Sequence, residues 1–167
     1  MLLDDIASSS YFAKFDVWWG FMNIRIKAGD EWKAAFVTPR GVFKPLVMFF
    51  GQTNTPPTFQ RYMNETFSQM SGERKLVIFM DDVIVHGKTR DELTACVGEF
   101  LQICKAENLR LKISKSTFET QEVNFLGYKV KGGQYSPCPV KTAAIRDWPA
   151  LMNLRELRSS IGFCNFY

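Results

Sequence analysis

The order of apolar patterns along the chain predicts an α+β fold, in which an antiparallel sheet carries helices on one face. Short β-favouring runs and helical periodicities are mixed along the 167 residues, without the strict strand–helix alternation of a parallel sheet. Hydrophobic residues make up 46% of the chain, which is enough to bury a core and too much for a disordered chain. The length favours one domain over two.

The first half of the chain is expected to form strands, turns and one helix. Strand candidates lie at residues 11–17, 23–26 and 33–37. Gly29-Asp30 predicts a hairpin turn between the second and third of these, and residues 38–41 predict a further turn. After a loop, a helix is expected to begin near Pro57, because proline suits the first helical position. Its apolar residues recur at helical spacing: Phe59, Met63, Phe67 and Met70.

The second half continues with a hairpin, helices and further strands. Leu76 to His86 is a β-favouring run that two acids interrupt, which indicates two short strands meeting at an acidic turn. Thr89 and Glu92 form a capping box for a helix that should end near Asn108. Further strands are expected at residues 110–113, 123–130 and 134–135, the last two flanking a Gly132-Gly133 turn. Two final helices are expected at 140–148 and after Asn153, which Glu156 helps to cap.

Composition narrows the classes of protein. A net charge of +4 permits a polyanionic partner without requiring one. The four cysteines form no C-x-x-C pair and the chain has one histidine, which argues against a structural zinc site or a disulfide framework. Cys96 and Cys104 are expected to be small buried apolar residues. No targeting signal and no apolar run of membrane-spanning length is visible, so we expect a soluble, intracellular protein with no membrane partner.

The acidic turn, Phe79-Met80-Asp81-Asp82-Val83, is the stretch most indicative of chemistry. Burying two unpaired carboxylates costs on the order of several kcal/mol per ion. A fold tolerates this cost only when the charge is neutralised. Magnesium would neutralise the pair, because it takes carboxylate oxygens and keeps sites for phosphates. Asp16 ends the first strand and could join the pair if the sheet places the two strands side by side. A solvated acidic turn without catalytic function is the alternative, and the residue pattern alone leaves both open.

Five segments resemble, in order, the motifs of retrotransposon and retroviral reverse transcriptases. They are Phe15 to Phe21, Phe49 to Gln60, Phe79-Met80-Asp81-Asp82, Leu109 to Phe118, and Phe125-Leu126-Gly127. Two further stretches, Gly29 to Phe36 and Asn153 to Tyr167, resemble gypsy-type long-terminal-repeat retrotransposons in particular. The resemblance covers essentially the whole chain and identifies it with the palm region of a Pol polyprotein.

The resemblance implies a ferredoxin-like polymerase palm with partial fingers. Residues 1–135 would form the catalytic domain, with a fingers insert at roughly 22–50, and residues 136–167 would begin a thumb or connection. The implied activity is that of an RNA-directed DNA polymerase, a nucleotidyltransferase that adds deoxynucleoside triphosphates to a primer 3′-end on an RNA or DNA template. The implied cofactor is two Mg²⁺ ions, with Mn²⁺ as a substitute, and the implied location is the cytoplasm, virus-like particles or the nucleus. The oligomeric state is left open.

Site residues follow from the family motifs, position by position. The expected catalytic residues are Asp16, Asp81, Asp82 and Lys115. The expected metal ligands are Asp16, the Val17 carbonyl, Asp81 and Asp82. The expected nucleotide contacts are Val17, Phe21, Phe50 and Gly51, where Phe21 would be the steric gate against a ribose 2′-hydroxyl. The expected primer and template contacts are Met80, Phe125, Leu126 and Gly127.

Several of these assignments have competitors. Lys112 competes with Lys115 for the role of proton donor, and both Phe21 and Met80 have simple packing as the alternative. Trp18 and Trp19 could stack on bases, but buried packing is the expectation. His86 is expected to be a strand-end residue rather than a ligand or base, and is left out of the site.

Departures from the family pattern lead to a second functional hypothesis. Phe79 stands where Tyr is usual, Gln52 where Leu is common, Pro57 where Ala is usual and Lys44 where an acid is common. Because few residues precede Asp16, we expect the fingers residues that grip the triphosphate to be missing and the isolated chain to have little or no activity. The alternative is a catalytically incomplete retroelement remnant with at most weak nucleic-acid binding. A nucleotide cyclase would need a G-G-[DE]-E-F-type turn and is disfavoured.

Overall fold

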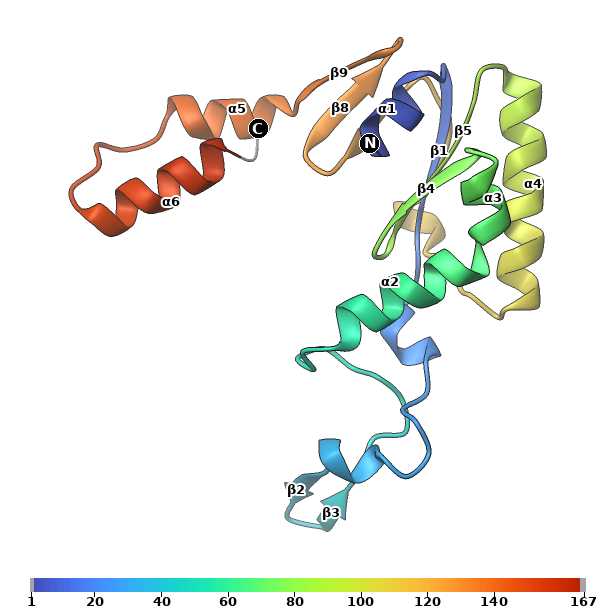
Figure 1. Ribbon diagram of the computed structural model, residues 1–167, viewed down its shortest axis with the longest axis vertical. Coiled ribbons are helices and arrows are strands. Elements are labelled where there is room, and N and C mark those ends of the chain that lie inside the picture. Colours follow the sequence, from blue (N-terminus) through green and yellow to red (C-terminus); the bar gives the residue numbers. More distant parts are fainter. Residues whose placement is uncertain (1, 166–167) are drawn as a thin grey trace.

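The computed structural model describes residues 2–165, and its centre is a four-stranded antiparallel sheet (Figure 1). The strand order is β4 (Leu76–Phe79), β5 (Asp82–Gly87), β1 (Tyr11–Asp16) and β6 (Thr117–Thr120). A separate hairpin joins β2 (Phe36–Thr38) and β3 (Gly41–Phe43). A second small sheet joins β7 (Glu122–Phe125), β8 (Tyr128–Lys131) and β9 (Gln134–Pro137). The α+β class expected from the sequence is confirmed.

Helices cover the sheet and extend beyond it. The α-helices are α1 (Leu2–Ala7), α2 (Thr55–Thr66), α3 (Ser68–Gly72), α4 (Arg90–Ala106), α5 (Pro139–Arg146) and α6 (Leu154–Cys164). Short 3-10 turns are η1 (Gly20–Asn23), η2 (Glu31–Ala34) and η3 (Ile113–Lys115). In Figure 1 the β2–β3 hairpin projects below the sheet, and α5 and α6 form an arm that extends away from it. Within residues 2–165, every helix is too short or too polar to cross a bilayer.

Alternation along β1 builds a core on each face of the sheet. Ala13 and Phe15 point to the side of α2 and α4, where Phe15 stacks on Phe100 with ring centroids 4.8 Å apart. Phe12 points to the opposite side and packs with Ile6 of α1 and Val130 of β8. Because side chains alternate along a strand, Asp16 at the end of β1 lies on the same face as Phe12. This face carries the second core, which contains Phe12, Ile6 and Val130.

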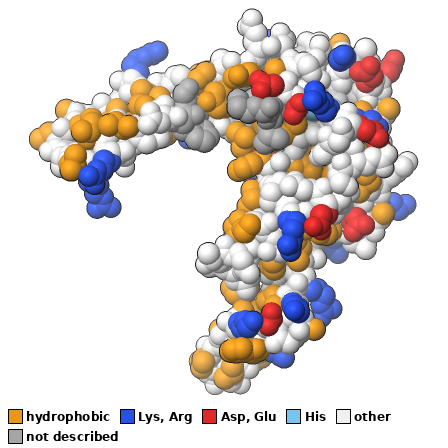
Figure 2. Space-filling model, in the orientation of Figure 1, with side chains coloured by type: hydrophobic (Ala, Val, Ile, Leu, Met, Phe, Trp, Pro, Cys, Tyr) orange, Lys and Arg blue, Asp and Glu red, His pale blue; other side chains and the backbone are white. Residues whose placement is uncertain are grey.

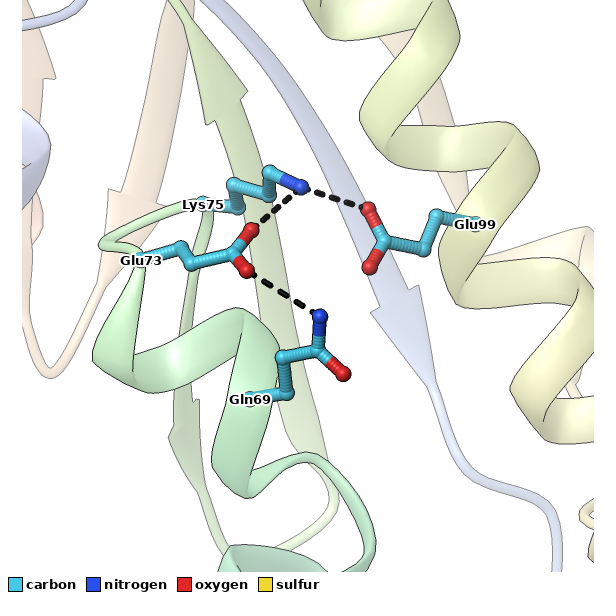
Figure 3. Close-up of polar contacts among 4 residues, drawn as sticks. All are labelled: Gln69, Glu73, Lys75 and Glu99. Carbon is cyan, nitrogen blue, oxygen red and sulfur yellow. Dashed lines mark hydrogen bonds and ion pairs between the residues drawn. The ribbon is translucent and has the colours of Figure 1, made fainter.

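A polar cluster links α3 and the residues just before β4 to α4, on the side of the sheet that carries α2 and α4 (Figure 3). Lys75 Nζ lies within ion-pair distance of Glu73 and 2.8 Å from Oε2 of Glu99 on α4. Gln69 on α3 donates to Oε1 of Glu73 at 3.1 Å. Hydrogen bonds from Lys75 to Glu73 and Glu99 raise the pKa of the Lys75 ammonium above its ordinary value, which favours its charged form.

The expected helix boundaries depend on capping signals that the structure confirms. Oγ1 of Thr89 accepts a hydrogen bond from the Glu92 amide at 3.2 Å, and the Glu92 carboxylate accepts from the Thr89 amide at 3.3 Å. Asn153 caps α6 in the same way, accepting from the Glu156 amide at 2.9 Å. Asn108 adopts a left-handed backbone, with φ of 53°, directly after α4. Local sequence was therefore sufficient to place these ends.

The hairpin expected at Gly29-Asp30 is wrong. Gly29 does form a turn, in which the Asp30 amide donates to the Lys27 carbonyl at 2.9 Å, but this turn leads into η2 rather than a strand. Residues 23–26 contribute only an isolated bridge from Arg25 to Val47. The hairpin lies instead at residues 38–41, where the Thr38 hydroxyl donates to the Gly41 carbonyl and Gly41 has φ of 122°.

The C-terminal strand boundaries also need correction. Residues 110–113 contain one isolated bridge, from Leu111 to Val17, and then continue into η3. Residues 123–130 are two strands rather than one, because Leu126 and Gly127 have φ of 51° and 81° and reverse the chain. The edge strand β6 and the helix α1 were not expected. The helices expected at 140–148 and after Asn153 are found as α5 and α6.

Apolar side chains remain exposed on the two projecting parts (Figure 2). Val37 and Val42 on the β2–β3 hairpin have 82% and 71% of their surface exposed. On the arm, Val140, Met152 and Leu154 are exposed. Cys96 and Cys104 are buried, as the sequence indicated.

Candidate active site

The register of the central sheet brings the three predicted aspartates to one end of neighbouring strands. Asp16 at the end of β1 lies directly opposite Asp82 at the start of β5. Asp81 occupies the turn between β4 and β5, and its carbonyl accepts a hydrogen bond from the Val17 amide at 3.0 Å. The predicted juxtaposition of the first strand with the acidic hairpin is therefore present in the fold.

The acidic turn is tight and strained. Met80 has φ of 55°, a left-handed conformation that costs a side-chain-bearing residue about 1–2 kcal/mol. Gln60 of α2 holds the turn in place: its Oε1 accepts from the Met80 amide at 2.7 Å, and its Nε2 donates to the Ile78 carbonyl at 3.4 Å. The sequence motif contained Gln60, but this supporting role becomes visible only when α2 is placed against β4.

Asp81 is the acid of the group that has an unpartnered buried oxygen. Its Oδ1 is buried and has no hydrogen-bond partner among residues 2–165. Burial raises the pKa of the Asp81 carboxyl, the negative charges of Asp16 and Asp82 raise it further, and Lys115 acts in the opposite direction. A carboxyl group with this combination of desolvation and like-charge neighbours is characteristic of a functional site.

Lysines pair with the two flanking aspartates. Lys14 Nζ lies 3.0 Å from Oδ1 of Asp82, and Lys115 Nζ lies 3.7 Å from Oδ2 of Asp16. Lys14 also donates to the Asn124 carbonyl of β7 at 3.3 Å, which ties the acidic edge to the β7–β8 hairpin. Sequence reasoning missed Lys14, although its position two residues before Asp16 places both side chains on one face of β1.

The donor set fits magnesium by its chemistry, since it consists of carboxylate and carbonyl oxygens and includes the unpartnered Oδ1 of Asp81. The side chains of this donor set are not grouped closely enough to form one metal site. Across residues 2–165, no three Asp, Glu, His or Cys side chains are close enough together to hold one metal ion. In this arrangement Asp82 and Asp16 each pair with a lysine of the chain itself.

Gly20 is required where the chain passes Asp81. A Cβ added to this glycine would lie 2.5 Å from Cζ of Phe59 and 2.8 Å from Oδ1 of Asp81. Both distances are far below a normal contact. The close packing therefore excludes any side chain at this position and keeps the segment after β1 against the acidic turn.

The predicted nucleotide contacts lie at the junction between the sheet and the β2–β3 projection. Phe21 is buried in the core, with 7% of its surface exposed, and meets Phe50 and Phe59 edge to face at 4.9 and 5.3 Å. Phe50 is 72% exposed. Gly51 is exposed, has φ of 100° and has open space where a Cβ would lie. Burial of Phe21 favours its packing role, while its contact with exposed Phe50 places it next to the surface.

Three of the four predicted primer contacts lie at the β7–β8 turn, and the fourth, Met80, lies in the acidic turn between β4 and β5. Phe125 is buried in the second core, whereas Leu126 and Gly127 make the reversal between the strands. The hydrogen bond from Lys14 to the neighbouring Asn124 places this hairpin beside the acidic edge. The end of β1, the acidic turn and the β7–β8 hairpin are distant in sequence and thus lie near one another in the fold.

The expectation that Trp18 and Trp19 are buried is wrong. Their exposed fractions are 44% and 64%, because the chain turns outward after β1 and Trp19 adopts a left-handed conformation. His86 agrees with its assignment as a residue near a strand end. It lies in β5, one residue before the end at Gly87, and its Nδ1 lies 2.9 Å from the Ser9 hydroxyl.

Comparison with known proteins places this geometry in a family. Residues 1–130 match the family described as reverse transcriptase (RNA-dependent DNA polymerase). The Tf2-3 and Tf2-7 transposon polyproteins of Schizosaccharomyces pombe are each 34% identical over 165 residues, which is 99% of this chain. The chain spans only 12% of the length of those polyproteins.

Solved structures share the fold at lower identity. The foamy viral protease–reverse transcriptase in complex with double-stranded DNA is 21% identical, with a TM-score of 0.89 over 99% of this chain and 29% of its own. The same kind of protein in complex with an RNA/DNA hybrid gives a TM-score of 0.83, over 99% of this chain and 22% of its own. With the family match covering most of the sequence, the chain belongs to the reverse transcriptase family.

Proposed function

We propose that this chain is the palm segment of an RNA-directed DNA polymerase that extends a primer 3′-end on an RNA or DNA template. The observation that carries the proposal is the placement of Asp16 opposite Asp82, with the unpartnered carboxylate of Asp81 in the adjoining turn. Family membership and the transposon polyprotein relatives support the same reaction. The gypsy-type motifs make a long-terminal-repeat retrotransposon the proposed source, and virus-like particles or the cytoplasm the proposed location.

Asp16, Asp81, Asp82 and the Val17 carbonyl are the proposed ligands of two Mg²⁺ ions, with Mn²⁺ as a substitute. Bound magnesium would favour ionisation of the primer 3′-hydroxyl and offset the charge of the triphosphate. Metal binding would also change the contacts that these aspartates make within the chain. Asp82 and Asp16 must exchange the lysine partners seen here for the metal, and the raised pKa of Asp81 must fall when a cation is present.

Lys115 is the proposed proton donor to the leaving pyrophosphate. Its ammonium lies 3.7 Å from Asp16 and its side chain is 60% exposed, so it can reach both the acidic edge and a ligand. Lys112 contacts Asp16 through its main chain, since its amide donates to the Asp16 carbonyl at 2.9 Å. The ion pair of Lys115 with a proposed metal ligand favours Lys115 over Lys112 for this role.

The remaining assignments concern the nucleotide and the primer. Phe21, Phe50 and Gly51 are proposed to contact the incoming deoxynucleotide, with the edge-to-face contact of Phe21 and Phe50 supporting a shared wall. Met80 and the Phe125–Gly127 turn are proposed to contact the primer. Duplex binding should depend mainly on backbone charge, and therefore weaken as salt rises.

The proposed division into parts follows the arrangement in Figure 1. Residues 1–135 would be the catalytic domain, with residues 22–50, which carry the projecting β2–β3 hairpin, as the fingers insert. Residues 136–167, of which those up to 165 are described, would begin the thumb or connection. Exposed apolar residues on α5 and α6 are consistent with an arm that packs against other structure.

The test is incorporation of labelled deoxythymidine triphosphate on poly(rA)/oligo(dT) with Mg²⁺ or Mn²⁺. The isolated chain is expected to incorporate little, and any incorporation should depend on the metal, be lost in the Asp81→Asn, Asp82→Asn double variant and be kept in Asp91→Asn, a matched change in the first turn of α4. Incorporation that persists in the double variant would show that the acidic turn is not the catalytic centre.

A catalytically incomplete retroelement remnant is the second candidate. The arrangement of the acids favours it, since no three Asp, Glu, His or Cys side chains of residues 2–165 are close enough together to hold one metal ion, and Asp16 and Asp82 pair with lysines. This candidate predicts salt-dependent binding of the primer–template by a folded, monodisperse sample that incorporates no nucleotide with either metal.

A further inference from the structure

Two neighbouring indoles lie open to solvent directly after the strand that ends at Asp16. Trp18 and Trp19 are 44% and 64% exposed, and their ring centroids are 5.4 Å apart at an interplanar angle of 55°. Tryptophan is the side chain that gains most from burial, so two adjacent exposed indoles are unusual on a free surface. Their exposure indicates a surface that is covered when a ligand is present.

The backbone fixes the positions of these rings. Trp19 has φ of 52° and ψ of 41°, a left-handed conformation that bulky residues seldom adopt. The Trp18 amide donates to the Arg110 carbonyl at 2.7 Å, and the Trp19 carbonyl accepts from the Met22 amide at 2.9 Å. The indoles are therefore presented by an ordered turn rather than by a flexible loop.

The indoles form one wall of a cavity of about 550 Å³, here called the indole pocket and lined by Trp18, Trp19, Lys105 and Arg110 among others. Lys105 comes from the last turn of α4 and Arg110 from the segment after it. Neither cation has an ion-pair partner within residues 2–165, and no acidic side chain lines the pocket. A mostly apolar cavity with two flat rings and two unpaired cations matches the chemistry of a nucleobase joined to a phosphate.

We propose that the indole pocket binds a nucleotide, with its base stacked on Trp18 or Trp19 and its phosphate near Lys105 and Arg110. None of the three aspartates of the acidic edge lines this pocket, so the site is separate from the proposed metal ligands. The proposal does not depend on polymerase activity. A free nucleotide and an unpaired nucleotide of a single strand offer the same chemistry, and the experiment below distinguishes them.

The experiment is isothermal titration calorimetry of the full chain in EDTA, without primer–template, using dATP and unlabelled octadeoxyadenylate as probes. EDTA removes the metals on which nucleotide binding at the acidic edge would depend. The Trp19→Gly variant removes the ring while glycine keeps the left-handed backbone. We expect Trp19→Gly and Arg110→Gln each to weaken binding by about tenfold or more.

The matched control is Trp32→Ala, which removes an indole that is 67% exposed on η2, outside the indole pocket. This variant should bind as tightly as the unaltered chain, and so should the Asp81→Asn, Asp82→Asn double variant. Thermal unfolding of each variant confirms that it is folded. Binding of dATP with this pattern of sensitivity supports a free-nucleotide site, and binding of the octamer alone supports an unpaired-strand site.

Several results would overturn the proposal. One is the absence of saturable binding of either probe. Another is tripolyphosphate binding as tightly as dATP, which would show that the base makes no contribution. Loss of binding in Trp32→Ala or in the double aspartate variant would place the ligand elsewhere. If the indole pocket fails these tests, the incorporation assay still decides the proposed polymerase function independently.

Discussion

Replacing Asp81 by asparagine is expected to stabilise the fold while removing a carboxylate that the proposed reaction requires. Oδ1 of Asp81 is buried without a hydrogen-bond partner in the part of the chain that the structure describes. Burial and the charges of Asp16 and Asp82 raise the pKa of this carboxyl. At neutral pH the folded state therefore holds a charge that its surroundings disfavour, and asparagine removes that charge while keeping the shape of the side chain.

The size of the gain is bounded by the penalty for burying an unsatisfied polar group, which is about 1–3 kcal/mol and larger for a charged one, and asparagine relieves only the part due to the charge because it keeps a polar atom at this position. Asp81 is only partly buried as a whole residue, so the lower end applies and we expect a gain of about 1 kcal/mol. For a chain of this length, that corresponds to a rise in Tm of about 2–4 °C. Thermal unfolding followed by circular dichroism at pH 7 measures it directly.

The pH dependence gives this prediction a second readout. Because the pKa of Asp81 is raised on folding, the folded state binds the proton more tightly than the unfolded chain, whose value is near 3.8. Ionisation of Asp81 thus costs stability above the folded pKa, and the cost disappears below the unfolded value. The gain from Asp81→Asn should be larger at pH 7 than near pH 4, where the cost of ionisation disappears.

Asp82→Asn is the matched control. It removes an ion pair with Lys14 at 3.0 Å between partly exposed side chains, which is worth about 0–1 kcal/mol, so its Tm should be unchanged or lower. The reasoning is refuted if Asp81→Asn melts below the unaltered chain at pH 7. It is equally refuted if both variants shift Tm upward by the same amount, because the effect would then not arise from the isolation of Asp81.

Four further substitutions test the packing at two glycines, a buried histidine and a helix cap. Gly20→Ala should lower the free energy of unfolding in urea by about 1–3 kcal/mol, since its Cβ would meet Phe59 at 2.5 Å, whereas Gly98→Ala, facing open space on α4, should raise it by about 0.5–1 kcal/mol. Burial lowers the pKa of His86, so the unfolded chain binds a proton more readily. Stability should therefore fall as the pH drops below about 6.5, and His86→Gln should flatten that slope in urea titrations at several pH values. Thr89→Ala should cost about 0.5–2 kcal/mol in the same assay, because its hydroxyl caps α4.

Elements with a complete local signal were predictable from the sequence. The 76–86 hairpin has two apolar runs around an acidic turn, and α4 has both a capping box and an apolar stripe. The strand β6 has no such signal, because it lies at the sheet edge with mostly exposed residues and shows no apolar alternation. The turn at Leu126 was missed for another reason: leucine rarely adopts a left-handed backbone, so only the following Gly127 could have marked it.

The juxtaposition of the three aspartates was predictable from the sequence, but the side chains with which they pair were not. Family motifs gave the three aspartates and Lys115, whereas the ion pair between Lys14 and Asp82 depends on how β1 and β5 align. Burial of Trp18 and Trp19 was expected from the general preference of tryptophan. The direction in which the chain leaves β1 decides their exposure, and that direction depends on Trp19 adopting a conformation which its residue type disfavours.

Backbone strain at three motif residues links these observations. Trp19, Met80 and Leu126 have φ between 51° and 55°, and each such residue costs about 1–2 kcal/mol relative to a relaxed conformation. Strain of this kind persists only where surrounding contacts overdetermine it, as Gln60 does for the Met80 turn. The same edge also carries the unpartnered carboxylate of Asp81. Three of the six described non-glycine residues with positive φ, together with the unpartnered carboxylate of Asp81, thus lie in motifs where metal, primer and nucleotide are proposed to bind, as expected if some stability has been traded for function there. The other three are Arg74, Asn108 and Glu119.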